Sequence, residues 1–89
     1  MIDRYQRTPS VLFAELGSDV VALEVNLGYC FGMQDGAAAI WNLLGDPIGI
    51  DEIVEQLTKT HEVDPATCRL DVERIIGQLE QEGLVTVVN

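Results

Sequence analysis

The chain has 89 residues, 47% of them hydrophobic, which is enough for one small domain with a core and excludes wholesale disorder. Fifteen acidic residues against five basic ones give a net charge of −10, which repels phosphate backbones and disfavours nucleic-acid binding. No apolar run reaches the length of a membrane span, and the N-terminus (MIDRYQRTPS) lacks the apolar region of a signal peptide, so we expect no membrane association and a cytoplasmic location.

No group of residues indicates catalysis or metal binding. Cys30 and Cys68 are far apart, and we interpret both as small buried hydrophobic residues rather than as a disulfide or a ligand pair. His61 is the only histidine, whereas a structural zinc site needs about four ligands. The acidic residues are scattered over helix faces, without the shared cleft that catalytic carboxylates need. The sequence therefore predicts a protein that is not an enzyme, with no metal and no cofactor.

The first half of the chain is typical of short strands. Residues 1–10 show no periodicity and are predicted to form a flexible arm ahead of a single domain over residues 11–89. Three apolar segments follow at residues 11–16, 20–25 and 29–33, separated by the turn clusters Gly17-Ser18-Asp19 and Asn26-Leu27-Gly28. Short sequential strands with tight turns predict an antiparallel meander, in which Gly28 takes a positive φ angle.

The second half has the periodicity of amphipathic helices. A first helix is predicted between its N-cap, Gln34 or Asp35, and the break at residues 45–47. In this stretch apolar residues recur at i, i+3, i+4 and i+7, namely Ala37, Ile40, Trp41 and Leu44. A second helix is predicted over about residues 50–60. The third begins with Asp64 as N-cap and Pro65 at its first position, and it ends at Gly83, before a β-like tail over residues 84–88.

This order of elements predicts an α+β fold, in which a three-stranded antiparallel meander precedes a three-helix bundle. The arrangement resembles a winged helix-turn-helix, an architecture that says little about function by itself. A transcription regulator of this shape would read DNA with its third helix. The only basic residues of that helix, Arg69 and Arg74, are interleaved with four acidic ones, Asp71, Glu73, Glu80 and Glu82. Because such a helix repels DNA more than it attracts it, DNA binding is disfavoured.

The third strand offers a surface for peptide binding. As the last strand of the meander, residues 29–33 have a free edge of N–H and C=O groups, and no lysine, proline or charge protects it. On the third helix the predicted core stripe is Cys68, Val72, Ile75 and Leu79, and Ile76 widens it to one side. An apolar shoulder beside an open edge would hold an extended peptide. The alternative is that Ile76 is ordinary core and that residues 1–10 or a second copy cover the edge.

Three stretches, in this order, resemble the PqqD-like family of small peptide-recognition domains. They are CFGMQDGAAAIWNLL, IDEIVEQL and EVDPATCRLDVERIIGQLEQEGLV, and the resemblance covers roughly residues 11–85. Members of this family, the RiPP recognition elements, bind leader peptides of ribosomally made, modified natural products. The short turn at residues 26–28 and the CFGM strand look closer to the stand-alone recognition protein of lasso-peptide clusters than to the pyrroloquinoline-quinone chaperone.

The resemblance implies a non-catalytic adaptor. In the lasso systems such a protein binds the leader of the precursor and presents it to a separate cysteine protease, after which a cyclase closes the ring. The leader adds as a strand antiparallel to the third strand and lies against the third helix. A Tyr and a Pro of the leader commonly serve as anchors.

Carried over by position, the implied peptide contacts are Tyr29, Cys30, Phe31, Gly32 and Met33 on the strand, and Arg69, Val72, Glu73 and Ile76 on the helix. If the other flank of the helix faced the strand, it would offer Asp71, Ile75 and Gln78 instead. Tyr29 stands where a basic residue is common in the family, which is expected to alter the preference for leaders.

Three alternatives stay open on the sequence. The chain could be the quinone-pathway chaperone, which binds a different peptide and a radical enzyme. It could be a transcription regulator with the same winged architecture. It could also be a homodimer that pairs through its strand edge.

Overall fold

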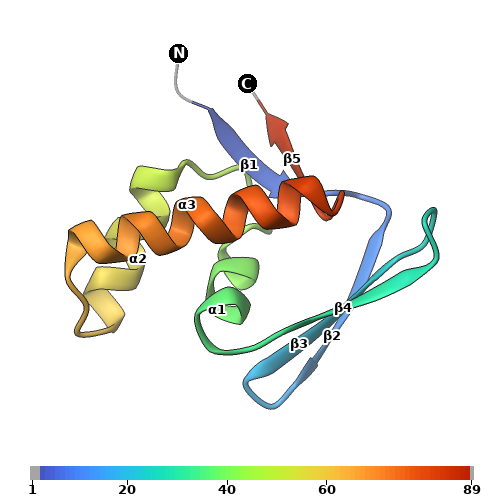
Figure 1. The fold of residues 1–89 in the computed structure, drawn as a ribbon, viewed down its shortest axis with the longest axis horizontal. Coiled ribbons are helices and arrows are strands. Elements are labelled where there is room, and N and C mark those ends of the chain that lie inside the picture. The colour runs from blue at the N-terminus through green and yellow to red at the C-terminus, as the bar shows by residue number, and fades with distance from the viewer. Residues whose placement is uncertain (1–2, 89) are drawn as a thin grey trace.

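The computed structural model describes residues 3–88, and within them the chain forms two small antiparallel sheets and three helices (Figure 1). In chain order the elements are β1 (Arg4–Arg7), β2 (Val11–Leu16), β3 (Asp19–Glu24), β4 (Tyr29–Met33), α1 (Asp35–Leu43), α2 (Ile50–Thr60), α3 (Pro65–Gln81) and β5 (Val85–Val88). The sheet β2-β3-β4 precedes the helices, so the predicted α+β fold with an antiparallel meander and three helices is confirmed.

The N-terminal residues differ most from the prediction. Instead of belonging to a flexible arm, Arg4–Arg7 form β1, which pairs antiparallel with β5 next to both ends of the chain (Figure 1). Tyr5 also exchanges two backbone hydrogen bonds with Ile48, at 2.8 and 3.0 Å. The prediction is therefore wrong for residues 4–7, because the partner strand lies at the far end of the sequence, where no local pattern reveals it. Residues 1 and 2 lie outside the described residues.

Arg7 of β1 connects this small sheet to α1. Its guanidinium donates from Nε and Nη2 to the carbonyl oxygen of Trp41, at 3.0 and 2.9 Å. The same oxygen, in the last turn of α1, also accepts from the N–H of Leu44 at 3.1 Å. The group also stacks on the ring of Phe13, 4.4 Å from its centroid. A cation at a helix C-terminus complements the helix dipole, so β1 stabilises α1 directly. Partial burial lowers the pKa of Arg7.

Strands β3 and β4 bury one face of the meander, whereas β2 is exposed on both faces beyond Val11. Val20, Ala22 and Met33 point inward and are almost fully buried, whereas the alternate residues point to solvent. Gly17 and Gly28 close the two hairpins with φ angles of +69° and +73°, so the positive φ predicted for Gly28 is confirmed. The second strand begins at Asp19, one residue before its predicted start.

The helix boundaries follow the predicted signals closely. Of the two candidates, Gln34 is the N-cap of α1, and α2 spans the predicted residues. At the start of α3 the Asp64 carboxylate accepts a hydrogen bond of 3.0 Å from the N–H of Thr67. At the other end, Gly83 has a φ of +77°, and the N–H of Leu84 donates to the carbonyl of Leu79 at 2.9 Å.

The core stripe of α3 differs from the prediction by one residue. The buried positions are Cys68, Val72, Ile76 and Leu79, with Ile76 only 2% exposed, while Ile75 is half-buried at the edge of the stripe. The groove role of Ile76 is therefore corrected, because its side chain faces the core. The rotation of α3 decides between two consecutive isoleucines that both fit an apolar stripe.

The two cysteines lie in different environments, and both are free. Cys68 is buried as predicted. Cys30 is exposed on the outer face of β4, which corrects the prediction for that residue. Among residues 3–88, no three or more His, Cys, Asp or Glu side chains are grouped so that they could hold a metal ion. The helices of this part of the chain are too short or too polar to cross a membrane.

Candidate peptide-binding site

The site begins at an open sheet edge. The strand order is β2-β3-β4, so β3 pairs with one edge of β4, and no strand within residues 3–88 pairs with the other. Of the two covers that the sequence left open, the N-terminal segment is not one, because β1 pairs with β5 in a separate sheet. The free edge of β4 therefore presents unpaired N–H and C=O groups to an additional strand.

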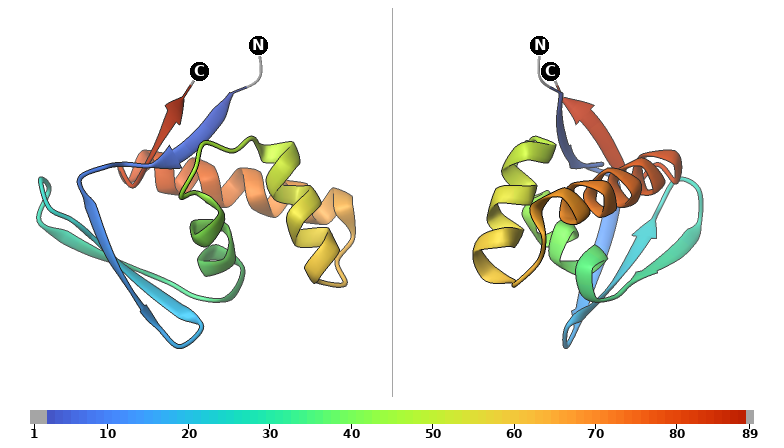
Figure 2. Two further views of the ribbon diagram at one scale, coloured as in Figure 1. Left: turned by 180° about the vertical axis from the view of Figure 1, so that it is seen from behind. Right: turned by 60° about the vertical axis from the view of Figure 1, so that its left-hand side comes forward.

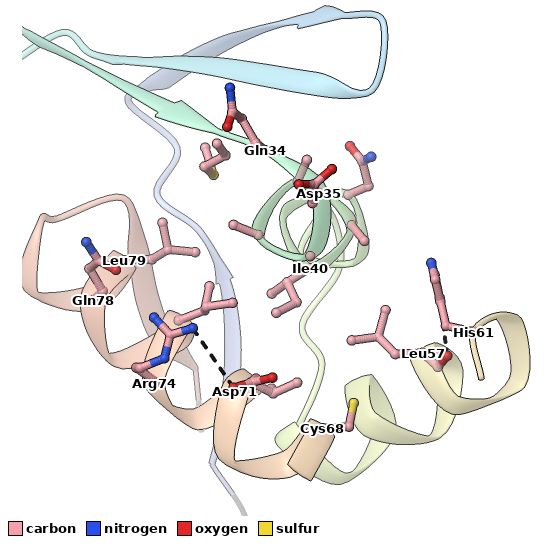
Figure 3. A pocket seen from close by; sticks show the side chains of 18 of the residues that line it. Gln34, Asp35, Ile40, Leu57, His61, Cys68, Asp71, Arg74, Gln78 and Leu79 are labelled. Carbon is pink, nitrogen blue, oxygen red and sulfur yellow. Dashed lines mark hydrogen bonds and ion pairs between the residues drawn. The ribbon is translucent and has the colours of Figure 1, made fainter. Parts of the chain in front are cut away.

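A cavity of about 930 Å³ lies beside this edge, between β4, α1 and α3, and extends to the C-terminal end of α2 (Figure 3). Met33, Ile40, Leu57, Cys68, Ile75 and Leu79 give it apolar walls. Polar side chains line its outer part, where Arg74 forms an ion pair of 4.0 Å with Asp71, next to Gln78. We call this cavity the groove. An apolar interior with a few polar groups at its mouth is typical of a binding pocket.

The groove brings together some of the predicted site residues. Phe31, Gly32 and Met33 of β4 line it, and Val72 lines it from α3. The side chain of Phe31 shares the inner face of the sheet with Met33, whereas Gly32 lies on the other face. Of the five predicted contacts on the strand, the last three therefore line the groove.

The other helix residues lie elsewhere. Arg69 hydrogen-bonds to Asp51 of α2, which raises the pKa of Arg69, and neither Arg69 nor Glu73 lines the groove. The flank of α3 that faces the groove carries Asp71, Ile75 and Gln78, which the sequence offered as the opposite choice. Sequence reasoning did not include Arg74 in the site, although its four-residue spacing from Gln78 places both on one helix face.

Tyr29 and Cys30, the first two residues of β4, lie outside the groove. Cys30 points to solvent from the outer face of the sheet. Tyr29 is half-buried, and its hydroxyl donates a hydrogen bond to the carbonyl oxygen of Glu82, directly after α3. Partial burial, together with the negative charge of Glu82, raises the pKa of Tyr29 above its ordinary value.

The family described as coenzyme PQQ synthesis protein D (PqqD) matches residues 14–85, which include the whole groove-facing part of β4 and α3. The chain belongs to the PqqD family. Among curated proteins, none matches the chain.

Two solved structures share the fold of this PqqD-family chain. One is TbiB1 in complex with the TbiA(beta) leader peptide, with 27% identity and a TM-score of 0.82 over 90% of this chain and 93% of that one. The other is a lasso peptide synthetase B1 complexed with the leader peptide, with 22% identity and a TM-score of 0.80 over 92% of this chain and 96% of that one. The resemblance to the PqqD-like family is confirmed, and the fold is that of two leader-bound proteins.

Proposed function

We propose that this chain is a non-catalytic recognition protein for the leader peptide of a ribosomally synthesised precursor, specifically a lasso-peptide precursor. The observation that carries the proposal is the open edge of β4 running alongside the groove. TbiB1, which has the same fold, is itself bound to a leader peptide.

The proposed binding mode is strand addition. Since every pair in the sheet β2-β3-β4 is antiparallel, the leader extends the sheet as an antiparallel strand beside β4. Its main-chain hydrogen bonds tolerate many sequences, so selectivity comes from the alternate side chains that enter the groove. Burying one large apolar side chain there contributes about 1.5–3 kcal/mol, which corresponds to about tenfold to hundredfold discrimination.

The proposal includes a partner enzyme. A bound leader has to reach a processing enzyme, and we assign this role to a cysteine protease of the same gene cluster, with a cyclase acting afterwards. In support, the outer face of the meander is exposed and largely apolar, with Leu12 and Leu16 each 61% exposed and Leu23 beside them. Exposed apolar surfaces of this kind often mark protein–protein contacts.

The proposed location is the cytoplasm, where a ribosomally made precursor meets its first enzymes. Cys30 and Cys68 are both free, which agrees with a reducing compartment.

The experiment that tests the function is fluorescence anisotropy with a labelled leader from a precursor encoded beside this gene. A scrambled leader and the core peptide are the controls. We expect saturable binding of the leader alone at low-micromolar strength or tighter. No binding up to about 100 μM, equivalent to roughly −5.5 kcal/mol, would reject leader recognition. The same titration with the precursor of the quinone pathway tests the chaperone alternative.

A further inference from the structure

The lining of the groove ends between the start of β4 and the C-terminal end of α3. On β4 its lining begins at Phe31, and on α3 it stops at Leu79. At the opposite end it continues past Met33 to the first residues of α1 and to Leu57 at the end of α2. A peptide in this groove therefore has room to continue past Met33.

One side chain closes the end of the groove at the start of β4. The ring of Tyr29 reaches from β4 to the end of α3, where its hydroxyl donates to the carbonyl of Glu82, one of the carbonyls that a helix end leaves unpaired. In the preceding turn, a methyl group of Leu27 lies 3.6 Å from the position that a β-carbon on Gly83 would take. The right-hand view of Figure 2 shows this turn next to the C-terminal end of α3.

A closed end limits the register of the bound peptide, which strand addition alone leaves open. Main-chain pairing alone does not fix the register, because a slip of two residues keeps every side chain on its own face of the sheet. A leader with alternating apolar residues could therefore bind in several registers. A side chain that fills one end of the groove excludes the registers that extend past it.

We propose that Tyr29 sets the register of the bound peptide by ending the groove, so that the peptide pairs beside residues 30–33 and leaves the sheet at Tyr29. The inference rests on the proposed function. In the antiparallel orientation, the N-terminal part of the paired segment lies near Met33, and its C-terminal part meets Tyr29. Because the core peptide follows the leader, the portion to be processed leaves the protein at this end, beside the exposed side chains of Val25 and Leu27.

The test locates the end of the paired segment by amide hydrogen exchange of a ¹⁵N-labelled leader, bound to the wild type or to Tyr29→Ala. The probe is the leader of the precursor encoded beside this gene. In the wild type, we expect alternate leader amides opposite residues 30–33 to exchange about tenfold or more slowly than in the free peptide, with no protection beyond. In Tyr29→Ala the protection extends by one or two residues toward the C-terminus of the leader, or a second, slipped register appears.

Leu27→Ala is the matched control, since it truncates an exposed apolar side chain in the turn before β4 but keeps the ring of Tyr29. We expect it to leave the wild-type protection pattern unchanged. The same extension in Leu27→Ala would overturn the assignment to Tyr29. If Tyr29→Ala does not fold, Tyr29→Thr tests the same point with a small, β-branched residue suited to a strand.

The remaining outcomes distinguish a failure of the register role from a failure of the proposed function. If the leader binds the wild type but its protection already runs past Tyr29, or does not change in either Tyr29 variant, the register role is wrong and leader recognition stands. If the leader does not bind the wild type at all, the proposed function fails and the register role fails with it.

Discussion

Ile75 and Ile76 are consecutive in the sequence, yet they face different parts of the molecule. Ile76 is 2% exposed and belongs to the core, whereas Ile75 is half-buried and lines the groove. We expect Ile76→Ala to lower the free energy of unfolding by about 2–5 kcal/mol, as truncation in a core does. Ile75→Ala should lower it by only about 1 kcal/mol, because less apolar surface is lost.

Leader binding should depend more on Ile75 than on Ile76. Ile75→Ala weakens binding of the labelled leader about tenfold, or about 1.4 kcal/mol, since it removes a wall of the groove. Urea unfolding and fluorescence anisotropy on the same two variants measure both effects. Unchanged leader affinity in Ile75→Ala would remove this flank of α3 from the site.

These two isoleucines also show which feature of the site the sequence does not determine, namely the flank of α3 that faces the groove. Helix α3, its N-cap at Asp64 and its end at Gly83 all follow from local signals. The choice between the two flanks depends on how the helix is rotated against α1 and β4, and that rotation is set by the packing of the whole core. Because 3.6-residue periodicity allows either isoleucine into the stripe, the sequence selected Arg69, Glu73 and Ile76, while the groove is lined by Asp71, Ile75 and Gln78.

Arg7 should contribute strongly to stability through its contact with Trp41. Two nitrogens of this charged, partly buried group share one acceptor, the Trp41 carbonyl oxygen, and a hydrogen bond to a charged group contributes about 1.5–3 kcal/mol. We expect Arg7→Ala to lower the free energy of unfolding by about that amount. Arg7→Lys should recover little of it, because an ammonium group has neither the planar fork nor the stacking surface of a guanidinium.

Arg4 provides the matched control, since it lies in the same strand but is exposed. Arg4→Ala should change the free energy of unfolding by less than about 0.5 kcal/mol. Equal effects of the two substitutions in urea unfolding would mean that the strand pairing, and not the Trp41 contact, matters at Arg7.

The strand that carries Arg7 could not be found by local reasoning. Residues 4–7 read RYQR, with no apolar alternation, and their partner β5 lies at the other end of the chain. The meander β2-β3-β4, by contrast, is formed by neighbours in sequence joined by glycine-containing turns, and it was predicted nearly residue by residue. A contact between distant segments thus explains the main error in the predicted fold. The rotation of α3 explains the main error in the predicted site.

Two glycines near the end of α3 should respond to alanine in opposite directions. Gly83 has a φ of +77°, a left-handed conformation that costs an alanine about 1–2 kcal/mol. Gly77 lies inside the helix with open space at its β-carbon position, so Gly77→Ala should raise the free energy of unfolding by about 0.8–1 kcal/mol through better helix propensity. Thermal or urea unfolding of both variants checks the signs, and a stabilising Gly83→Ala would contradict the described end of α3.

Leu23 distinguishes partner docking from leader binding. Its side chain lies on the outer face of the sheet opposite Leu12, away from the groove, so Leu23→Glu should leave the affinity for the labelled leader within about twofold. Placing a charge in the exposed apolar face should reduce leader-dependent cleavage by the proposed partner protease by about tenfold or more, because an unpaired charge is costly in an apolar contact. Leu70→Glu is the control, since Leu70 is 68% exposed on α3, away from that face, and cleavage should be unaffected. Wild-type cleavage rates in Leu23→Glu would show that the protease docks elsewhere, while loss of leader binding would place the outer face within the recognition site itself.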